Sequence, residues 1–160
     1  MRKYLLHILI ISFVFLLAPT AQVASYAGVD DPLSLETAKE EVRNNPDDAG
    51  AHNNLGVSYR NSGMYKEAKE SYEQALRIDP DYAEAHYDLA YTYFNLGKNE
   101  ESFESYKQAV RINPDYAKAQ YMLGLTYLDL NDRDSALEQY EILKKLDTEL
   151  ANKLFNEIYE

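Results

Sequence analysis

Residues 49–82 read AGAHNNLGVSYRNSGMYKEAKESYEQALRIDPDY, and residues 83–116 read AEAHYDLAYTYFNLGKNEESFESYKQAVRINPDY. The two stretches are identical at 18 of 34 positions without a gap. Residues 117–150 continue in the same register as AKAQYMLGLTYLDLNDRDSALEQYEILKKLDTEL, although the match is weaker. A period of 34 residues predicts a repeat structure, in which each unit buries its apolar face against its neighbours.

Each unit is expected to contain two helices. In the first half of a unit, small and apolar residues recur at spacings of three and four, which places them on one helical face. These residues are Leu55, Gly56 and Tyr59; Leu89, Ala90 and Tyr93; and Leu123, Gly124 and Tyr127. The second half repeats a similar set at matching positions. Its residues are Ala68, Tyr72 and Ala75; Ser102, Tyr106 and Ala109; and Ala136, Tyr140 and Leu143.

Turn-forming residues punctuate the units. Gly63, Gly97 and Asn131 stand between the two halves, where a turn needs a permissive backbone. The boundaries between units carry Asp79-Pro80 and Asn113-Pro114, and proline suits the first turn of a following helix. We expect Asp79, Asp81, Asn113 and Asp115 to satisfy free backbone N–H groups at these junctions.

The units resemble the tetratricopeptide repeat (TPR) family. The first unit fits the family pattern at seven positions: Leu55, Gly56, Tyr59, Ala68, Tyr72, Ala75 and Pro80. Departures are mild, such as Ser102 for Ala and Thr148 for Pro. The resemblance covers residues 49–150 in three units (49–82, 83–116 and 117–150). It implies an all-α, right-handed α-solenoid of helix-turn-helix units, and an interaction module rather than an enzyme.

Both ends of the repeats are predicted to carry capping helices, which terminal repeats need for solubility. Residues 28–48 read as a linker and an N-terminal capping helix, with Leu35, Ala38 and Val42 at helical spacing. Residues 148–160 read as an amphipathic C-terminal capping helix that carries Leu154 and Ile158.

Residues 1–27 are predicted to be a secretory signal peptide. Arg2 and Lys3 precede an apolar run over residues 4–18, and Pro19 and small residues follow it. Fifteen residues of helix reach about 22 Å, which is short of the ~30 Å hydrocarbon core of a bilayer. We expect cleavage after Ala27, with cleavage after Ala24 or Ser25 as the nearest alternative, and a periplasmic or secreted protein. The alternative is an uncleaved anchor that holds the protein in the inner membrane by residues 4–18.

The composition excludes several function classes. The chain has 160 residues, 16 Lys+Arg against 27 Asp+Glu, and a net charge of -11. Such an acidic balance argues against sequence-independent nucleic-acid binding. The absence of Cys excludes disulfides, thiolate metal sites and cysteine nucleophiles.

No motif predicts catalysis, a metal site or a cofactor. His52 and His86 occupy equivalent positions one repeat apart, and we expect them to pack or hydrogen-bond between helices rather than to share a metal ion. Paired carboxylates such as Glu40 with Glu41 and Glu100 with Glu101 are typical of solvated helix faces. The sequence holds no Gly-rich loop of the kind that cradles phosphate.

A second apolar stripe on the first helices predicts a partner-binding groove. In TPR folds the first helices line the concave side, so the resemblance places these residues in the groove. They are Asn53, Val57 and Arg60; Tyr87, Tyr91 and Phe94; and Tyr121, Leu125 and Leu128, with Lys118 at the rim. Apolar anchors in such a patch commonly carry binding energy. Part of the stripe could instead be core between repeats or lie under the closing helix.

Some TPR domains bind a partner's C-terminal carboxylate through Lys, Asn and Arg side chains. The matching positions here are Asn53, Val57, Asp88, Lys118 and Met122, of which only Lys118 agrees. We therefore expect no carboxylate clamp.

The leading functional hypothesis is an exported, non-enzymatic adaptor or scaffold that binds a peptide or helix of another protein. One alternative is a self-associating structural protein, in which the groove of one copy takes the end helix of another. Another is an accessory subunit of a cell-envelope assembly. The sequence names neither the partner nor the biological process.

Overall fold

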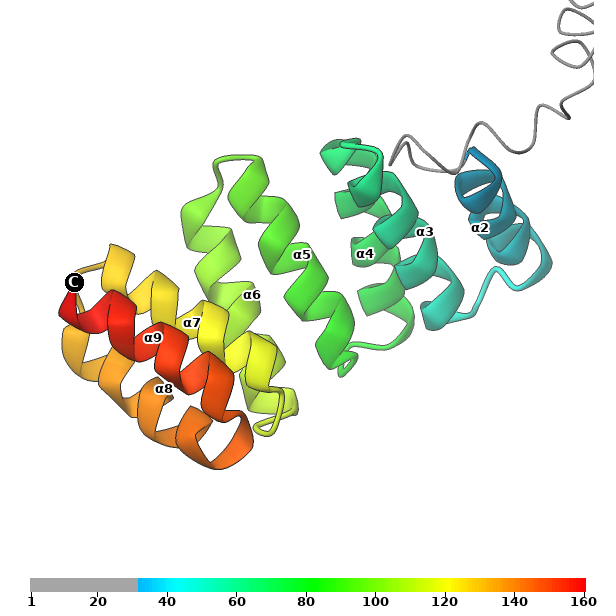
Figure 1. The fold of residues 1–160 in the computed structure, drawn as a ribbon. Coiled ribbons are helices and arrows are strands. Elements are labelled where there is room, and N and C mark those ends of the chain that lie inside the picture. Colours follow the sequence, from blue (N-terminus) through cyan, green and yellow to red (C-terminus); the bar gives the residue numbers. More distant parts are fainter. Residues whose placement is uncertain (1–31) are drawn as a thin grey trace, which may run out of the picture. The chain divides into compact units, whose positions relative to one another are not determined.

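The computed structural model describes residues 32–160, and within this range the chain forms eight helices and no strand (Figure 1). The helices are α2 (Pro32–Asn44), α3 (Ala49–Asn61), α4 (Tyr65–Ile78), α5 (Ala83–Asn95), α6 (Asn99–Ile112), α7 (Ala117–Asp129), α8 (Arg133–Leu146) and α9 (Thr148–Tyr159). The signal segment predicted at residues 1–27 lies outside the described residues.

Consecutive helices pack as the pairs α3/α4, α5/α6 and α7/α8. The second helix of each pair also contacts the first helix of the next pair, α4 with α5 and α6 with α7. The first helices begin at Ala49, Ala83 and Ala117, one 34-residue period apart. This arrangement is an α-solenoid, which confirms the fold class predicted from the repeat.

The turn inside each pair depends on one residue with a positive φ angle. Gly63 has φ 72°, Gly97 has φ 74° and Asn131 has φ 58°. Glycine adopts this conformation freely, and asparagine tolerates it better than most residues do. The next N–H in each turn donates to the carbonyl of Tyr59, Tyr93 or Tyr127 at 2.8–2.9 Å, which closes the end of the helix.

The boundaries between units form turns that use only half of the expected polar side chains. Asp79 Oδ1 accepts a hydrogen bond from the Asp81 N–H at 3.1 Å, and Asn113 Oδ1 accepts one from the Asp115 N–H at 3.2 Å. The next helices begin after Tyr82 and Tyr116, and neither helix has a side-chain cap. The prediction is therefore confirmed for Asp79 and Asn113 and wrong for Asp81 and Asp115, which lie two residues ahead of the helix.

The two histidines stabilise the same boundaries. The Nε2–H of His52 donates to the carbonyl of Pro46 at 2.9 Å, and that of His86 donates to the carbonyl of Pro80 at 3.0 Å. Gln120 Nε2 makes the equivalent bond to Pro114 at 2.8 Å. Each bond fixes a boundary carbonyl to the following first helix. The histidines therefore hydrogen-bond to the preceding turn, not across a helix pair.

The closing helix, α9, departs from the pattern of the earlier first helices. Thr148 stands where the earlier boundaries have proline, and α9 begins at that residue. Asp147 caps it, accepting from the N–H groups of Glu149 at 3.0 Å and Leu150 at 3.1 Å. Helix α9 contacts both α7 and α8.

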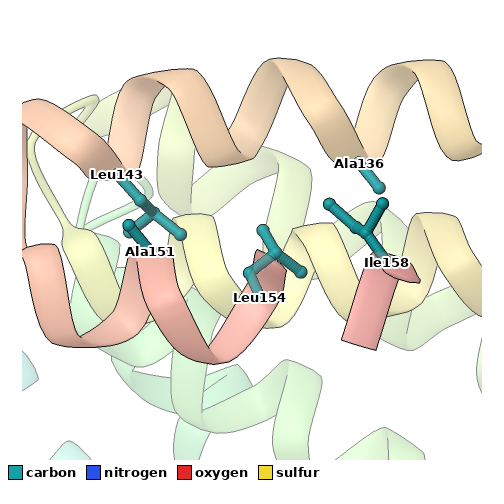
Figure 2. Close-up of a cluster of buried hydrophobic side chains, with 5 residues drawn as sticks. All are labelled: Ala136, Leu143, Ala151, Leu154 and Ile158. Carbon is teal, nitrogen blue, oxygen red and sulfur yellow. The ribbon is translucent and has the colours of Figure 1, made fainter. Parts of the chain in front are cut away.

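A core cluster joins α8 to the closing helix. Figure 2 shows its buried members, which are Ala136 and Leu143 of α8 and Ala151, Leu154 and Ile158 of α9. Leu154 is fully buried and also lies against Gly124 of α7. The closing helix thus buries apolar surface of the last helix pair.

Candidate functional site

The residues predicted to form the groove lie on α3, α5 and α7, but the structure divides them into three groups. Tyr91 and Phe94 of α5 are exposed, as is Lys118, whereas Tyr87 and Arg60 are half-buried. The α7 residues pack under the closing helix. On α3, Asn53 is buried and Val57 is partly buried against the core.

The accessible group surrounds a hollow of about 470 Å³. Helix α3 contributes Arg60 and Asn61, α5 contributes Tyr87, Asp88 and Tyr91, and Tyr116 and Lys118 come from the start of α7. Tyr91 is 38% exposed, and Phe94, one turn further along α5, is 55% exposed. We call Tyr87, Tyr91 and Phe94 the open aromatic surface.

Arg60 and Asp88 form an ion pair at the floor of this hollow. Their side chains are only 22% and 13% exposed. Burial raises the pKa of Asp88 above its usual range. The Arg60 guanidinium lowers this pKa, but by less than burial raises it. The guanidinium carbon of Arg60 also lies 5.6 Å from the centre of the Tyr91 ring, which is a cation–aromatic contact. The ion pair therefore helps to hold Tyr91 in place.

Tyr87 is held by other aromatic rings. Its ring centre lies 5.1 Å from that of Tyr116 and 5.8 Å from that of Tyr106. Burial raises the pKa of all three hydroxyl groups above the usual value of about 10, so they stay protonated into the alkaline range. The surface around the hollow thus offers neutral phenol groups and aromatic ring area.

Of the predicted groove residues on α3, Asn53 is buried and Val57 is partly buried. Asn53 is 7% exposed, and its amide lies next to Asp88, whose pKa it lowers. Val57 packs against the buried cluster of Ala68, Tyr72 and Leu89. The structure therefore corrects the assignment of Asn53, whose side chain is buried, whereas Val57 is only partly buried and its place in the groove stays a prediction.

The predicted groove residues on α7 pack against the core of the last helix pair. Tyr121, Leu125 and Leu128 are partly buried and pack against the cluster that includes Leu154 and Ile158 of the closing helix. The sequence left open whether these residues face a ligand or the interior. In the structure α9 covers this part of the stripe.

Tyr116 and Asn61 line the hollow although the sequence did not single them out. Tyr116 ends its repeat unit, and Tyr82 stands at the same position one period earlier. That recurrence was the one available signal for Tyr116. Lys118, which was predicted at the rim, is exposed and has no ion pair within residues 32–160.

No three His, Asp or Glu side chains in residues 32–160 come together as a group that could hold a metal ion. Over the same range, no helix has the length and apolar character needed to span a bilayer.

Comparison with solved structures gives similar folds. A TPR protein of Thermus thermophilus superposes with a TM-score of 0.67 and 26% identity, over 79% of this chain and 72% of that chain. MamA superposes with a TM-score of 0.64 and 24% identity, over 78% of this chain and 84% of that chain. At this identity the similarity to MamA shows the fold alone. The first TPR of Spaghetti, bound to the HSP90 peptide SRMEEVD, superposes with a TM-score of 0.64 and 26% identity, over 69% of this chain and 90% of that chain.

Comparison with family models gives the same result at the level of sequence. No curated protein matches this chain. A model described as TPR repeat matches residues 58–97 and 91–131, and a model described as tetratricopeptide repeat matches residues 117–149. These matches together span residues 58–149, which is more than half of the chain, and the match at 117–149 covers the helix pair α7/α8. The chain belongs to the tetratricopeptide repeat family.

Proposed function

We propose that this protein is a non-catalytic interaction module that binds a partner protein on the open aromatic surface of Tyr87, Tyr91 and Phe94. The observation that carries the proposal is the exposure of Tyr91 and Phe94 on α5. Most other large apolar side chains of the stacked helices are at least partly buried. Exposed aromatic side chains gathered on one face commonly mark an interaction site.

The chemistry of the surface favours a peptide or helix with apolar anchors. Tyr91 is positioned by Arg60, and Tyr87 by its neighbouring rings, so little side-chain freedom is lost on binding. Lys118 adds an unpaired positive charge beside the rings. The Spaghetti domain is a similar fold with a short peptide bound, which supports a peptide ligand here.

A carboxylate clamp is not part of the proposal. Such a clamp needs several cationic and amide side chains converging on one carboxylate. Asn53 is buried beside Asp88, and the Arg60 charge is already paired. A free C-terminus would therefore meet Lys118 alone.

We further propose that the protein works outside the cytoplasm, because of the basic, apolar and small-residue order of residues 1–27. Cleavage after Ala27 would remove about 3 kDa of the 18.4 kDa chain. Intact-mass measurement on protein from the cell envelope tests this. A full-length mass in the membrane fraction would instead support the anchor. At that location we propose that the protein acts as an adaptor for its partner.

The binding proposal is tested by affinity capture from the source cells. The baits are the full chain, a Tyr91→Ala variant and an Ile142→Ala control. Ile142 is 37% exposed on α8, so its truncation removes a similarly exposed apolar side chain elsewhere. We expect the parent and the control to retain a partner that Tyr91→Ala holds at least about tenfold more weakly. Equal capture by all three baits would contradict the proposed surface.

Self-association is the second candidate, and the exposed aromatics of the closing helix favour it. Phe155 is 40% and Tyr159 57% exposed, and their ring centres lie 4.5 Å apart. Sedimentation velocity over a range of concentrations tests this candidate. A mass that stays monomeric at the highest concentration would exclude it.

A further inference from the structure

A second hollow, of about 410 Å³, lies where the C-terminal ends of α5 and α7 meet the first half of α6. Phe94 and Leu130 stand at its edge, and Phe103 contributes to its wall. It lies apart from the hollow at Arg60 and Lys118, and no residue lines both. Phe94 alone also belongs to the open aromatic surface.

The apolar part of this hollow combines a fixed ring with two exposed side chains. Phe103 meets the Tyr127 ring edge-on, with ring centres 5.3 Å apart, and the Lys107 ammonium lies 4.9 Å from its centre. Phe94 and Leu130 are 55% and 58% exposed. An apolar side chain of another molecule could therefore remove apolar surface of both from water, which favours binding.

The polar part of the hollow is acidic. Glu100, Glu104 and Asp129 line it, and no Lys or Arg does. Glu104 is paired with Lys107 at 2.9 Å. Glu100 and Asp129 form no ion pair with any basic side chain of residues 32–160, whereas the neighbouring Glu101 is paired with Lys98. Two unpaired carboxylates thus remain beside an exposed apolar surface.

We propose that this hollow is a second docking site, which binds an apolar side chain of a partner protein segment that carries Lys or Arg next to it. The apolar anchor lies between Phe94, Phe103 and Leu130, and the adjacent basic side chain reaches Glu100 or Asp129. An acidic segment would place its charges against those same carboxylates. Charge complementarity therefore selects a basic partner.

The test uses two synthetic peptides with both ends blocked. Each has a central Phe, flanked on both sides by two Lys in the first peptide and by two Glu in the second. Backbone amide NMR signals of the full chain are followed during titration with each peptide. We expect the Lys peptide to shift the signals of residues 99–104 and 126–130 in a saturable way, and the Glu peptide to shift neither segment. No shift, or equal shifts with both peptides, would overturn the proposal.

Matched variants separate the hollow from the general negative charge of the protein. Leu130→Ser removes an exposed apolar side chain outside the open aromatic surface, and we expect the Lys peptide to bind about tenfold more weakly. Glu100→Gln/Asp129→Asn should weaken binding several-fold at low salt and less at high salt. The control Glu138→Gln/Glu157→Gln makes the same change in net charge on α8 and α9 and should bind as the parent does. Equal weakening by both charge variants would mean non-specific attraction and would overturn the site.

The outcome is independent of the proposed function. A Tyr91→Ala variant changes the open aromatic surface but no residue of this hollow, so it should bind the Lys peptide normally. Loss of peptide binding in Tyr91→Ala together with normal binding in Leu130→Ser would place the peptide on the open aromatic surface. That result would overturn this inference and leave the proposed function standing.

Discussion

Leu154 of the closing helix packs directly against Gly124 of α7. A Cβ atom placed on Gly124 would lie 2.6 Å from Leu154 Cδ2 and 3.1 Å from Leu154 Cδ1. Leu154 is fully buried, so it has little room to withdraw. This contact fixes how closely α9 approaches α7, and therefore how much of the α7 stripe it covers.

Gly124→Ala should therefore destabilise the protein. Overpacking costs about 1–3 kcal/mol, and the better helix propensity of alanine returns up to about 1 kcal/mol, so we expect a net loss of about 1 kcal/mol. Urea unfolding followed by circular dichroism measures the change. Gly56→Ala should cost more, because a Cβ there would lie 2.5–2.9 Å from three atoms of the rigid, buried Tyr72 ring. Equal stability of both variants and the parent would contradict these contacts.

The buried tyrosines predict a loss of stability in alkali. Burial raises the pKa of Tyr93 to about 12 and also raises the pKa of Tyr72, Tyr106 and Tyr116. In the unfolded chain tyrosine ionises near pH 10. The stabilisation is therefore complete below about pH 10 and is lost as the pH rises toward the folded pKa values, because the unfolded state then binds fewer protons.

Tyrosinate absorbance and helical circular dichroism, followed together against pH, check this prediction. We expect most of the buried tyrosines to ionise in step with the loss of helix. Tyr106→Phe removes one buried hydroxyl that has no hydrogen-bond partner within the described residues, and it should make the loss less steep. Complete ionisation while the helices remain intact would show that these hydroxyls are not buried.

Arg60→Met should leave Asp88 as a buried carboxylate without its partner. The pair is mostly but not fully buried, so we expect a loss of about 2 kcal/mol, between the values for exposed and buried pairs. The pKa of Asp88 is already raised and should rise further in the variant. The deficit should thus be largest at neutral pH and shrink as the pH falls through that raised pKa and the carboxyl gains a proton.

Urea unfolding of the parent and Arg60→Met at several pH values measures that deficit. In Arg60→Met/Asp88→Asn no carboxylate remains at this position, so its stability relative to the parent should depend less on pH. A deficit in Arg60→Met that does not change with pH would contradict the role given to Asp88.

The boundary hydrogen bonds give a prediction with an internal control. Gln120 makes the bond to Pro114 that His86 makes to Pro80. His86→Gln should thus change stability by less than about 0.5 kcal/mol, whereas His86→Leu should cost about 1 kcal/mol because the Pro80 carbonyl loses its donor. Thermal unfolding of both variants separates the two effects. Equal losses would mean that His86 contributes packing and not a hydrogen bond.

The local features of the repeats were predictable from the sequence. Each depends on one residue type at a fixed phase, as with Gly63 and Gly97 at positive φ or Pro80 and Pro114 at the boundaries. Asn131 was placed correctly in the same turn for the same reason. The start of α9 also follows from Thr148 in place of proline.

The division of the groove stripe was not predictable in the same way. Tyr91 and Leu125 occupy equivalent positions, and one is exposed while the other packs near the closing helix. That difference depends on how closely α9 approaches α7, which is set by a contact between residues 30 positions apart, Gly124 and Leu154. The sequence did not predict the hollow at Phe103 and Leu130, because three helices form it and no periodic pattern in the sequence indicates how they meet.

The most direct test of the central claim is photo-crosslinking in the source cells. A photoreactive phenylalanine analogue replaces Tyr91 on the open aromatic surface or Ile142 on α8, two positions that are 38% and 37% exposed. We expect a discrete partner adduct from position 91 and none from position 142. Adducts of the same size and yield from both positions, or an adduct from position 142 alone, would contradict it.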